Sequence, residues 1–386
     1  MDKIFLDYKS FCYLCIPYFS TKCKKNFPTK TDKKRIKTLF LVKIKKKRRH
    51  FMFIPTEIFY EKAIENYPLG KELLERYREK NVPCTIIENH NAIEEMRKKE
   101  NKEFPKMKQN LIIGVRKTHR FVPNHKVSDF LVPYTSSGCI AMCLYCYLVC
   151  NYNKCAYLRL FVNREQMLDK IIRVANESEK PLTFEIGSNS DLILENTITG
   201  NLEWTIENFA QKAEKGFLTF PTKFDRVEPL LSLNHKGKTI VRMSVNPQEI
   251  ISQIEIGTSP LKNRVEAANR LKEAGYPVGI LIAPVILVEN WKVLYAELIQ
   301  YLAENLSEKI KKEAVFEIIF MTYSYIHEAI NTEAFPNKPS LYNKEKMTVR
   351  GRGKYRYKEE EKQEAEAFLR EQMQKYFPNN EILYIV

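Results

Sequence analysis

Short apolar runs alternate with amphipathic stretches along most of the chain, and this order predicts strands that alternate with helices. After about residue 129 the strand-like runs are Leu182–Ile186, Phe217–Phe220, Thr239–Val245, Val278–Ala283 and Val315–Ile319. The helical patterns between them are Arg164–Val174, Leu202–Ala213, Asn263–Ala274 and Trp291–Glu304. Repeated strand–helix units imply an α/β protein with a parallel sheet, and five or six in a row favour a complete or partial barrel. The chemistry of such a barrel lies at the carboxyl ends of its strands.

The segments on either side of this series carry other patterns. Residues 52–128 are expected to form a small α/β lead-in domain, with helices at Tyr60–Glu79 and Ala92–Lys102 and strands at Cys84–Glu88 and Leu111–Val115. Residues 336–386 hold a basic segment, a charged helix over residues 359–376 and a closing strand over residues 382–386. The predicted organisation is therefore 1–51, 52–128, 129–335 and 336–386, with the barrel in the third part.

Composition places the chain among ordinary globular proteins, because 44% of its 386 residues are hydrophobic and 28% are charged. No run approaches the roughly 18 uncharged apolar residues that a membrane-spanning helix needs. The net charge of +16 lies mostly in residues 1–50, where 16 Lys and Arg face three Asp. We expect residues 1–51 to be a loosely ordered basic arm. Met52 opens the first globular pattern, which raises the hypothesis that translation begins there.

The N-terminal segment shows no clear secretion signal, so we expect a cytoplasmic protein whose nine cysteines stay reduced. Cys12, Cys15 and Cys23 include a C-x-x-C pair that is able to bind zinc. No fourth ligand follows at zinc-finger spacing, so zinc is the less favoured interpretation of this pair.

A second group of cysteines carries the strongest chemical signal. Cys139, Cys143 and Cys146 have C-x-x-x-C-x-x-C spacing, and they follow the strand-like run Phe130–Pro133 at the start of the strand–helix series. Three thiolates on one tight loop can bind three irons of a four-iron cluster and leave the fourth iron open to a substrate or cofactor. The alternatives are a zinc knuckle completed by Cys150 and a set of buried thiols.

The sequence around the triplet resembles the spore photoproduct lyase family of the radical S-adenosylmethionine (SAM) superfamily. The resemblance begins with Val132-Pro-Tyr-Thr-Ser-Ser-Gly-Cys139, Tyr145-Cys146-Tyr147-Leu148 and Tyr157-Leu-Arg-Leu-Phe-Val-Asn163. The same order and spacing continue in Tyr67-Pro-Leu-Gly-Lys-Glu-Leu73, Leu111-Ile-Ile-Gly-Val-Arg-Lys-Thr118, Thr222-Lys-Phe224, Ser244-Val-Asn246, Gly257-Thr-Ser-Pro-Leu261 and Glu273-Ala-Gly-Tyr-Pro277. The likeness covers residues 52–386, and residues 1–51 have no recognised counterpart.

This resemblance implies both a fold and a reaction. The fold is a partial (β/α)6 TIM-like radical SAM barrel with a [4Fe-4S] cluster. The reaction repairs spore photoproduct, two thymines joined by a methylene bridge in DNA, through a 5′-deoxyadenosyl radical formed from SAM. An electron donor such as ferredoxin or flavodoxin, and the cytoplasm of a spore-forming bacterium, are implied as well.

The resemblance also assigns residues. It places Cys139, Cys143 and Cys146 on the cluster. It places five positions on SAM, namely Tyr147, Ser190, Lys223, Ser244 and the backbone of Ala283. Each has a structural alternative, since the serines also suit helix caps and a lysine also suits a solvated surface.

One departure from the family bears on catalysis. The family pattern Phe-Glu-x-x-Cys-x-Ser-Asp appears here as Phe184-Glu-Ile-Gly-Ser188-Asn-Ser190-Asp191, so Ser188 replaces the cysteine that returns hydrogen to the thymine radical. A serine O–H bond is too strong for that step. Tyr147, with Tyr145 completing a relay, is one candidate donor, although both rings also suit packing beside the cluster. Cys150 and Cys155 are other candidates.

A basic segment near the C-terminus is the predicted DNA contact. It carries seven basic residues against one acid over residues 344–358, and its Gly351 and Gly353 suit a hairpin turn. Cations bind phosphates and aromatic rings stack on unpaired bases, which suits Arg350, Arg352, Lys354, Tyr355, Arg356 and Tyr357. A solvated hairpin without a ligand is the structural alternative. Residues 316–327 lack the basic residues that the family carries there.

Two other functions stay open from the sequence. One is a family member that keeps the cluster and SAM chemistry but acts on another substrate, as Ser188 would permit. The other is a DNA-binding protein without enzymatic activity that holds a structural zinc ion.

Overall fold

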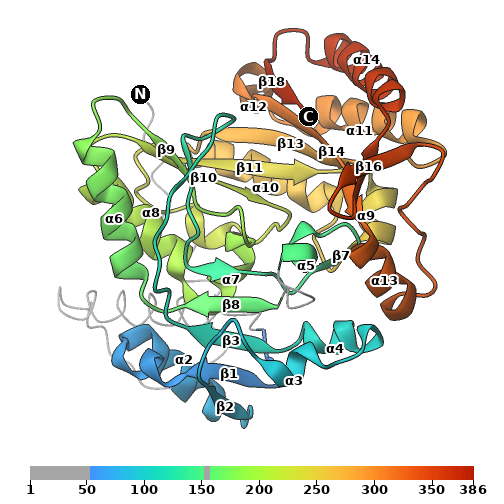
Figure 1. The fold of residues 1–386 in the computed structure, drawn as a ribbon. Coiled ribbons are helices and arrows are strands. Elements are labelled where there is room, and N and C mark those ends of the chain that lie inside the picture. The colour runs from blue at the N-terminus through green and yellow to red at the C-terminus, as the bar shows by residue number, and fades with distance from the viewer. Residues whose placement is uncertain (1–52, 152–156) are drawn as a thin grey trace, which may run out of the picture. The chain divides into compact units, whose positions relative to one another are not determined.

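Seven parallel strands form the centre of the protein and are neighbours in the order in which they occur along the chain (Figure 1). An eighth, β4 (Val122–Pro123), pairs antiparallel with β5 at one edge. The parallel strands are β5 (Phe130–Leu131), β9 (Thr183–Glu185), β10 (Phe217–Thr222), β11 (Thr239–Val245), β13 (Val278–Val285), β14 (Phe316–Phe320) and β18 (Ile382–Ile385). This computed structural model describes residues 53–151, without the side chains of the last two, and residues 157–386.

The strands are apolar and largely buried because helices follow them along the chain and pack on the sheet. These helices are α6 (Arg164–Glu177), α7 (Leu192–Thr199), α8 (Asn201–Lys212), α9 (Gln248–Ile254), α10 (Leu261–Glu273), α11 (Trp291–Asn305), α12 (Glu308–Glu313) and α14 (Glu359–Tyr376). A 3-10 turn, η4 (Glu228–Leu230), lies between β10 and β11. The α/β class and the partial barrel are therefore confirmed, with one more parallel strand than a (β/α)6 unit requires.

A second sheet of five strands packs its own apolar residues. Its order is β2 (Cys84–Ile87), β1 (Ile58–Glu61), β3 (Leu111–Gly114), β8 (Leu158–Phe161) and β6 (Ser136–Ser137). Short helices adjoin it, namely η2 (Lys62–Asn66), α2 (Pro68–Arg78), α3 (Glu94–Arg97), η3 (Asn101–Glu103) and α4 (Phe104–Met107). The sheet takes strands from both sides of residue 128, and residues 52–386 form one compact unit.

Two expected helices in this region are wrong in their bounds. The expected helix Tyr60–Glu79 begins only at Pro68, because Ile58–Glu61 forms a buried strand between two others. Proline suits that first helical position, since its missing N–H has no helical partner there. The expected charged helix Ala92–Lys102 is two short pieces, α3 and η3, because Met96 is the one buried residue of α3.

A three-stranded sheet lies beside the barrel and contains the basic segment. It comprises β15 (Thr322–Ser324), β16 (Met347–Gly351) and β17 (Lys354–Tyr357), and helix α13 (Tyr325–Ala334) follows β15. The turn between β16 and β17 holds Gly351, Arg352 and Gly353 at φ values of 100°, 51° and 69°. Two glycines supply this left-handed backbone, so the expected hairpin is confirmed.

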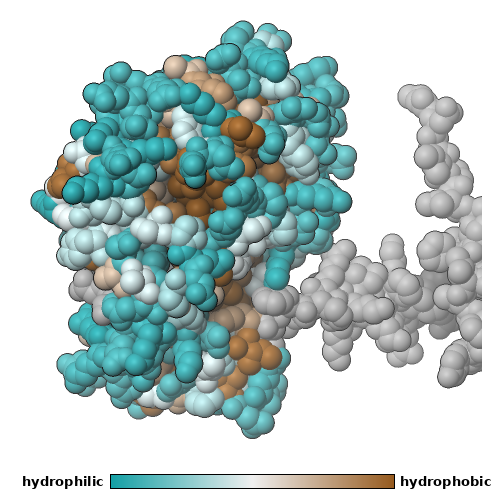
Figure 2. Space-filling view, turned by 90° about the vertical axis from the view of Figure 1, so that its right-hand side faces the viewer, coloured by the Kyte–Doolittle hydropathy of each residue, from teal (hydrophilic) through white to brown (hydrophobic). Residues whose placement is uncertain are grey.

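The surface seen in Figure 2 is mostly hydrophilic, with hydrophobic side chains gathered near its middle. None of the helices in the described part of the chain has the length and apolar character needed to cross a membrane. The expectations for residues 1–51, with Cys12, Cys15 and Cys23, for the start at Met52, and for the Cys150 and Cys155 side chains all lie outside the described residues.

Candidate active site

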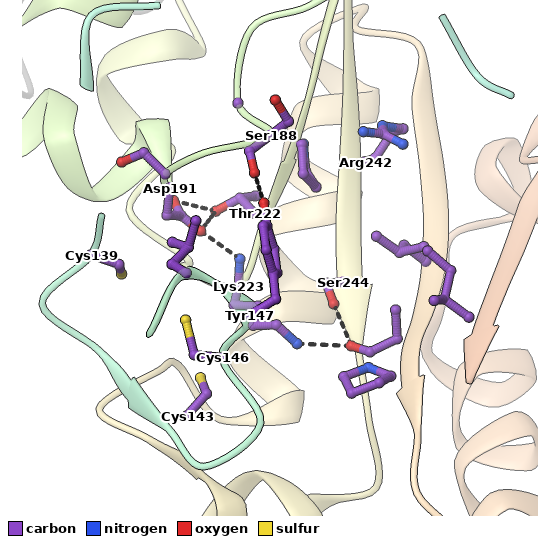
Figure 3. Close-up of a pocket in the computed structure, with 18 of the residues that line it drawn as sticks. Cys139, Cys143, Cys146, Tyr147, Ser188, Asp191, Thr222, Lys223, Arg242 and Ser244 are labelled. Carbon is purple, nitrogen blue, oxygen red and sulfur yellow. Dashed lines mark hydrogen bonds between the residues drawn. The ribbon is translucent and has the colours of Figure 1, made fainter. Parts of the chain in front are cut away.

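A cavity of about 510 Å³ opens at the carboxyl ends of the barrel strands (Figure 3). All ten residues predicted to bind the cofactors or to take part in catalysis line it, namely Cys139, Cys143, Tyr145, Cys146, Tyr147, Ser188, Ser190, Lys223, Ser244 and Ala283. They come from loops and strand ends far apart in the sequence. A parallel barrel brings such ends to one rim, which is why its active site forms there.

The loop that carries the three cysteines is fixed at several points. Strand β7 (Met142–Cys143) pairs with β12 (Glu255–Ile256), and helix α5 (Tyr147–Asn151) begins directly after Cys146. Two side chains of α13 bind its backbone: His327 Nε2 lies 2.9 Å from the Cys146 carbonyl, and Asn331 donates to the Leu144 carbonyl at 2.8 Å. The cysteines are therefore held against the cavity.

The three thiols suit an iron–sulfur cluster as ligands. They are free cysteines and half-buried. Burial raises the pKa of Cys139 to about 12 and also raises that of Cys143. A metal centre that replaces the thiol protons removes the cost of burying thiolate charge.

A four-iron cluster and a single metal ion make different demands on the three thiols. In the described residues, no three or more His, Cys, Asp or Glu side chains are grouped so as to hold one metal ion. A tetrahedral zinc site needs sulfurs about 2.3 Å from one point. A four-iron cluster needs no such convergence, because each thiolate binds a different iron.

Lys223 lies at the end of β10 and faces the cavity. Its Nζ donates to Glu255 Oε1 at 2.6 Å and to the Ala283 carbonyl at 2.8 Å, and Ser244 Oγ donates to the same carbonyl at 3.1 Å. Three of the predicted SAM positions therefore form one hydrogen-bonded group. Lys223 is not a freely solvated surface lysine, since only 21% of its side chain is exposed.

Ser190 differs from these residues because its hydroxyl is buried and has no hydrogen-bond partner in the described structure. A buried hydroxyl without a partner is costly and is satisfied when a polar ligand group binds. The cap of α7 is its neighbour Asp191, whose Oδ1 accepts from Ile193 N and Leu194 N. The helix-cap alternative for Ser190 is therefore wrong, and its hydroxyl suits a cofactor.

Glu255 is the buried centre of the site and was not predicted. Besides Lys223, it accepts from Arg264 Nη2 at 2.7 Å, from Asn246 Nδ2 at 2.9 Å and from the Tyr145 hydroxyl. Burial raises its pKa, but Lys223 and Arg264 outweigh burial and hold the pKa well below its usual value. Glu255 precedes and Arg264 follows the family-like run Gly257–Leu261. Their spacing in the sequence does not indicate that the two side chains form an ion pair.

Tyr145 and Tyr147 lie on opposite sides of Cys146 in sequence and differ in environment. Burial and the adjacent Glu255 raise the pKa of Tyr145 well above its usual value. Tyr147 is 50% exposed, and its hydroxyl donates to the Ser188 carbonyl. Tyr147 therefore contacts the backbone of Ser188, which stands where the family has its hydrogen-donor cysteine.

The predicted DNA-binding residues form a separate group outside the cavity. Arg350, Arg352, Lys354 and Arg356 are exposed on the hairpin, and Tyr355 is half-buried beside Tyr342 with ring centroids 4.6 Å apart. The expectation that Tyr357 stacks on a base is wrong, because this residue is only 5% exposed and its hydroxyl accepts from Leu287 N. The alternation of a strand turns it toward the core.

Known proteins are similar to this chain in sequence and in fold over almost all of its described residues. The family model for spore photoproduct lyase matches residues 53–386. The spore photoproduct lyase of Bacillus subtilis (strain 168) is 31% identical over 338 residues, which cover 86% of this chain and 98% of that protein. The Clostridium acetobutylicum enzyme of the same name is 30% identical over 334 residues, covering 85% and 98%.

Solved structures agree with the sequence relatives. A spore photoproduct lyase complexed with dinucleoside spore photoproduct matches with a TM-score of 0.79 and 29% identity. A double mutant with bound AdoMet, which is SAM, and dinucleoside spore photoproduct matches with a TM-score of 0.80 and 29% identity. Each match covers 86% of this chain and 99% of the other. The chain therefore belongs to the spore photoproduct lyase family.

Proposed function

We propose that this protein is a radical SAM spore photoproduct lyase, which converts the methylene-bridged thymine dimer of DNA into two thymines. The observation that carries the proposal is the common cavity of the cysteine triplet and the predicted SAM residues at the barrel rim. Membership of the family supports it. The lesion and AdoMet named in the solved relatives support the substrate and the cofactor.

The thiols of Cys139, Cys143 and Cys146 bind a [4Fe-4S] cluster in this proposal. Lys223, Ser190, Ser244, Tyr147 and the Ala283 carbonyl bind SAM. When both are bound, they supply a 5′-deoxyadenosyl radical that removes a hydrogen atom from the lesion. Ferredoxin or flavodoxin is the expected kind of electron donor, and the cytoplasm of a spore-forming bacterium is the expected setting.

The charges around Lys223 suit an amino-acid ligand. Ionised Glu255 holds the Lys223 ammonium at the cavity wall, where a cation attracts a ligand carboxylate. The backbone carbonyl of Ala283 accepts from Lys223 and Ser244 in this structure, and a ligand ammonium would take the place of one of these donors. A carboxylate and an ammonium are the charged groups at the amino-acid end of SAM.

Tyr147 is the hydrogen donor that the site best supports. Ser188 occupies the position of the family's cysteine, and a serine O–H bond is too strong to break in this step. The three triplet cysteines are the cavity's only thiols among the side chains that the structure describes. A phenol O–H is weaker, and the Tyr147 hydroxyl donates to the Ser188 carbonyl, while the Tyr145 hydroxyl donates to Glu255.

The hairpin suits a DNA backbone at the mouth of the cavity. Thr322 lines the cavity and pairs with Arg356 of β17, so the exposed cations of the hairpin begin at the cavity rim. Cations bind phosphates without regard to sequence, and a damaged base pair costs less to extrude than an intact one. We infer that Arg350, Arg352, Lys354 and Arg356 hold the strand while the lesion enters.

An anaerobic assay tests the proposal. Reconstituted, dithionite-reduced protein is mixed with SAM and dinucleotide spore photoproduct, and thymidylyl-thymidine and 5′-deoxyadenosine are followed by chromatography. Formation of both products is expected. 5′-Deoxyadenosine without repaired dinucleotide would point to another substrate, an alternative that the named relatives do not favour. If cluster-loaded protein forms neither 5′-deoxyadenosine nor repaired dinucleotide, the enzymatic function is refuted.

A Tyr147→Phe variant tests the donor, with Tyr342→Phe on the surface as its control. Loss of the phenol is expected to lower clean repair and to increase abortive products while 5′-deoxyadenosine still forms. Unchanged product composition in Tyr147→Phe would exclude Tyr147 and direct attention to Cys150 and Cys155.

A further inference from the structure

Three strands of the barrel each carry one charged residue within an apolar run, and these three charges meet. Arg242 of β11 donates to Glu185 of β9 and to Glu317 of β14, with N···O distances of 2.8 Å in both pairs. The Tyr384 hydroxyl of β18 also donates to Glu317. We call Glu185, Arg242 and Glu317 the ion cluster.

The ion cluster opens into the same cavity as the cofactor residues. Glu185, Arg242 and Tyr384 line the cavity. Arg242 and Ser244 are two residues apart on β11, so their side chains point to the same side of the sheet. Figure 3 shows Arg242 across the cavity from Cys139, Cys143 and Cys146. A ligand at Arg242 is therefore on the side of the cavity opposite the loop that carries Cys139, Cys143 and Cys146.

The hydrogen bonds of the ion cluster are incomplete. Arg242 Nε and Glu317 Oε1 are buried and have no partner among the described atoms. Arg242 is 5% exposed and Glu317 is fully buried. Burial and the Glu317 charge raise the pKa of Glu185, while Arg242 acts in the opposite direction. Of Arg242 and Glu317, only Arg242 lines the cavity, and its unpaired Nε–H costs free energy unless a ligand or water there accepts from it.

The two charged groups of the ion cluster that line the cavity, the Arg242 guanidinium and the Glu185 carboxylate, match one edge of a thymine ring. The imide edge presents a carbonyl acceptor, an N3–H donor and a second carbonyl acceptor in a row. A guanidinium donates to a carbonyl, and a carboxylate accepts from an N–H. Cytosine presents an acceptor at N3 and a donor at N4, so the same pair of side chains disfavours it. Enzymes that extrude a base read it by this edge.

We propose that the ion cluster is the thymine-recognition site of this enzyme, in which Arg242 donates to a carbonyl oxygen of one thymine of the lesion and Glu185 accepts its N3–H. Glu317 and Tyr384 hold Arg242 in place and do not contact the base. The inference rests on the proposed function and deepens it, because it assigns the base specificity to named side chains.

A change in the ligand tests this site without altering the protein. Dinucleoside spore photoproduct methylated at N3 of either thymine lacks one N–H and is otherwise the same lesion. Binding to cluster-loaded protein with SAM is measured by anaerobic fluorescence titration or calorimetry. We expect methylation of one of the two thymines to raise Kd at least about tenfold, since a hydrogen bond to a charged group is lost. Equal affinity of the parent and both methylated lesions would overturn the inference.

A matched pair of variants separates a direct contact from crowding by the methyl group. In Glu185→Gln the carboxamide presents an N–H donor where the base also donates, so the affinity for the parent lesion is expected to fall. The ratio of Kd for the methylated lesion to Kd for the parent lesion is then expected to approach one. Thr219→Val is the control, because Thr219 pairs with Glu185 between neighbouring strands, has a buried hydroxyl without a partner and does not line the cavity. A methylation penalty as large in Glu185→Gln as in wild type would refute the contact.

The outcomes also separate this inference from the proposed function. Repair of the parent dinucleoside with no methylation penalty keeps the lyase and removes the thymine site. If Glu185→Gln changes the Kd of SAM tenfold and leaves the Kd of the lesion unchanged, the ion cluster binds SAM and the inference is overturned. If wild-type protein neither binds nor repairs the parent lesion, the proposed function falls and the inference falls with it. If Glu185→Gln does not fold, the comparison of ligands on wild-type protein still decides.

Discussion

Replacing Glu255 by glutamine is expected to destabilise the protein strongly, because within the described part of the chain this carboxylate is the only negative partner of Lys223 and Arg264. The side chains of Glu255 and Arg264 are both 0% exposed, and Lys223 is 2.6 Å away. Removing one partner of a buried ion pair costs about 3–5 kcal/mol, since the other charge stays buried without compensation. Domains have about 5–15 kcal/mol in total, so the loss is a large share of the stability.

Equilibrium unfolding in urea measures this change. With a slope of about 3 kcal/mol per molar urea, the midpoint is expected to fall by roughly 1–1.7 M at pH 7. Glu266→Gln on the exposed side of α10 is the control, because its surface ion pair with Lys262 at 3.9 Å is expected to contribute less than about 1 kcal/mol. A loss below about 1 kcal/mol in Glu255→Gln would refute the reasoning.

The pH dependence gives a second check with a definite sign. The pKa of Glu255 is below its ordinary value of 4.5 in the folded protein, so its stabilisation is fully present above that pH and is lost as pH falls through the folded pKa. The difference between wild type and Glu255→Gln is expected to stay constant from pH 7 to about pH 5. It then shrinks below about pH 4.5. A difference that grows on acidification would contradict the assignment.

Three further predictions concern ligands. Lys223→Met removes the cation proposed to meet the SAM carboxylate, so the Kd of SAM, measured by calorimetry, is expected to rise by about 10- to 150-fold; an unchanged Kd would exclude the contact. Ser190→Ala removes a hydroxyl that has no partner in the described structure, so urea unfolding without SAM is expected to be unchanged within about 0.5 kcal/mol while SAM binding weakens; a large loss of stability would show that the hydroxyl has another role. Arg350→Ala combined with Arg356→Ala is expected to reduce the slope of log K against log salt for a DNA oligonucleotide by about 2, and an unchanged slope would remove both residues from the DNA contact.

Local patterns were sufficient for the barrel and its rim. The apolar runs of β10, β11, β13 and β14 are long and bounded by loops, so their strands were predicted within a few residues. The triplet of Cys139, Cys143 and Cys146 was found from its spacing, and Lys223, Ser190 and Ser244 were found through the family resemblance. All of them line one cavity. The order of parallel strands makes this convergence a consequence of the fold class.

The lead-in region was harder to predict, because its elements are short and depend on their neighbours. Ile58–Glu61 has no period that separates a strand from a helix, and its pairing with β2 and β3 decides the matter. Tyr357 was expected to stack on a base because aromatics alternate with cations in that segment. The register of β16 and β17 instead turns it into the core.

The sequence by itself determined the fold class and the family, since these depend on periodicity and on short motifs, and it supplied the residues that we propose to hold the cofactors. Tertiary structure alone decided which distant charges meet. Glu255 with Arg264 and Lys223, and Arg242 with Glu185 and Glu317, come from separate strands and loops whose spacing in sequence says nothing about distance. Each pair becomes interpretable only after folding, because a charge buried in the barrel must find its partner across strands.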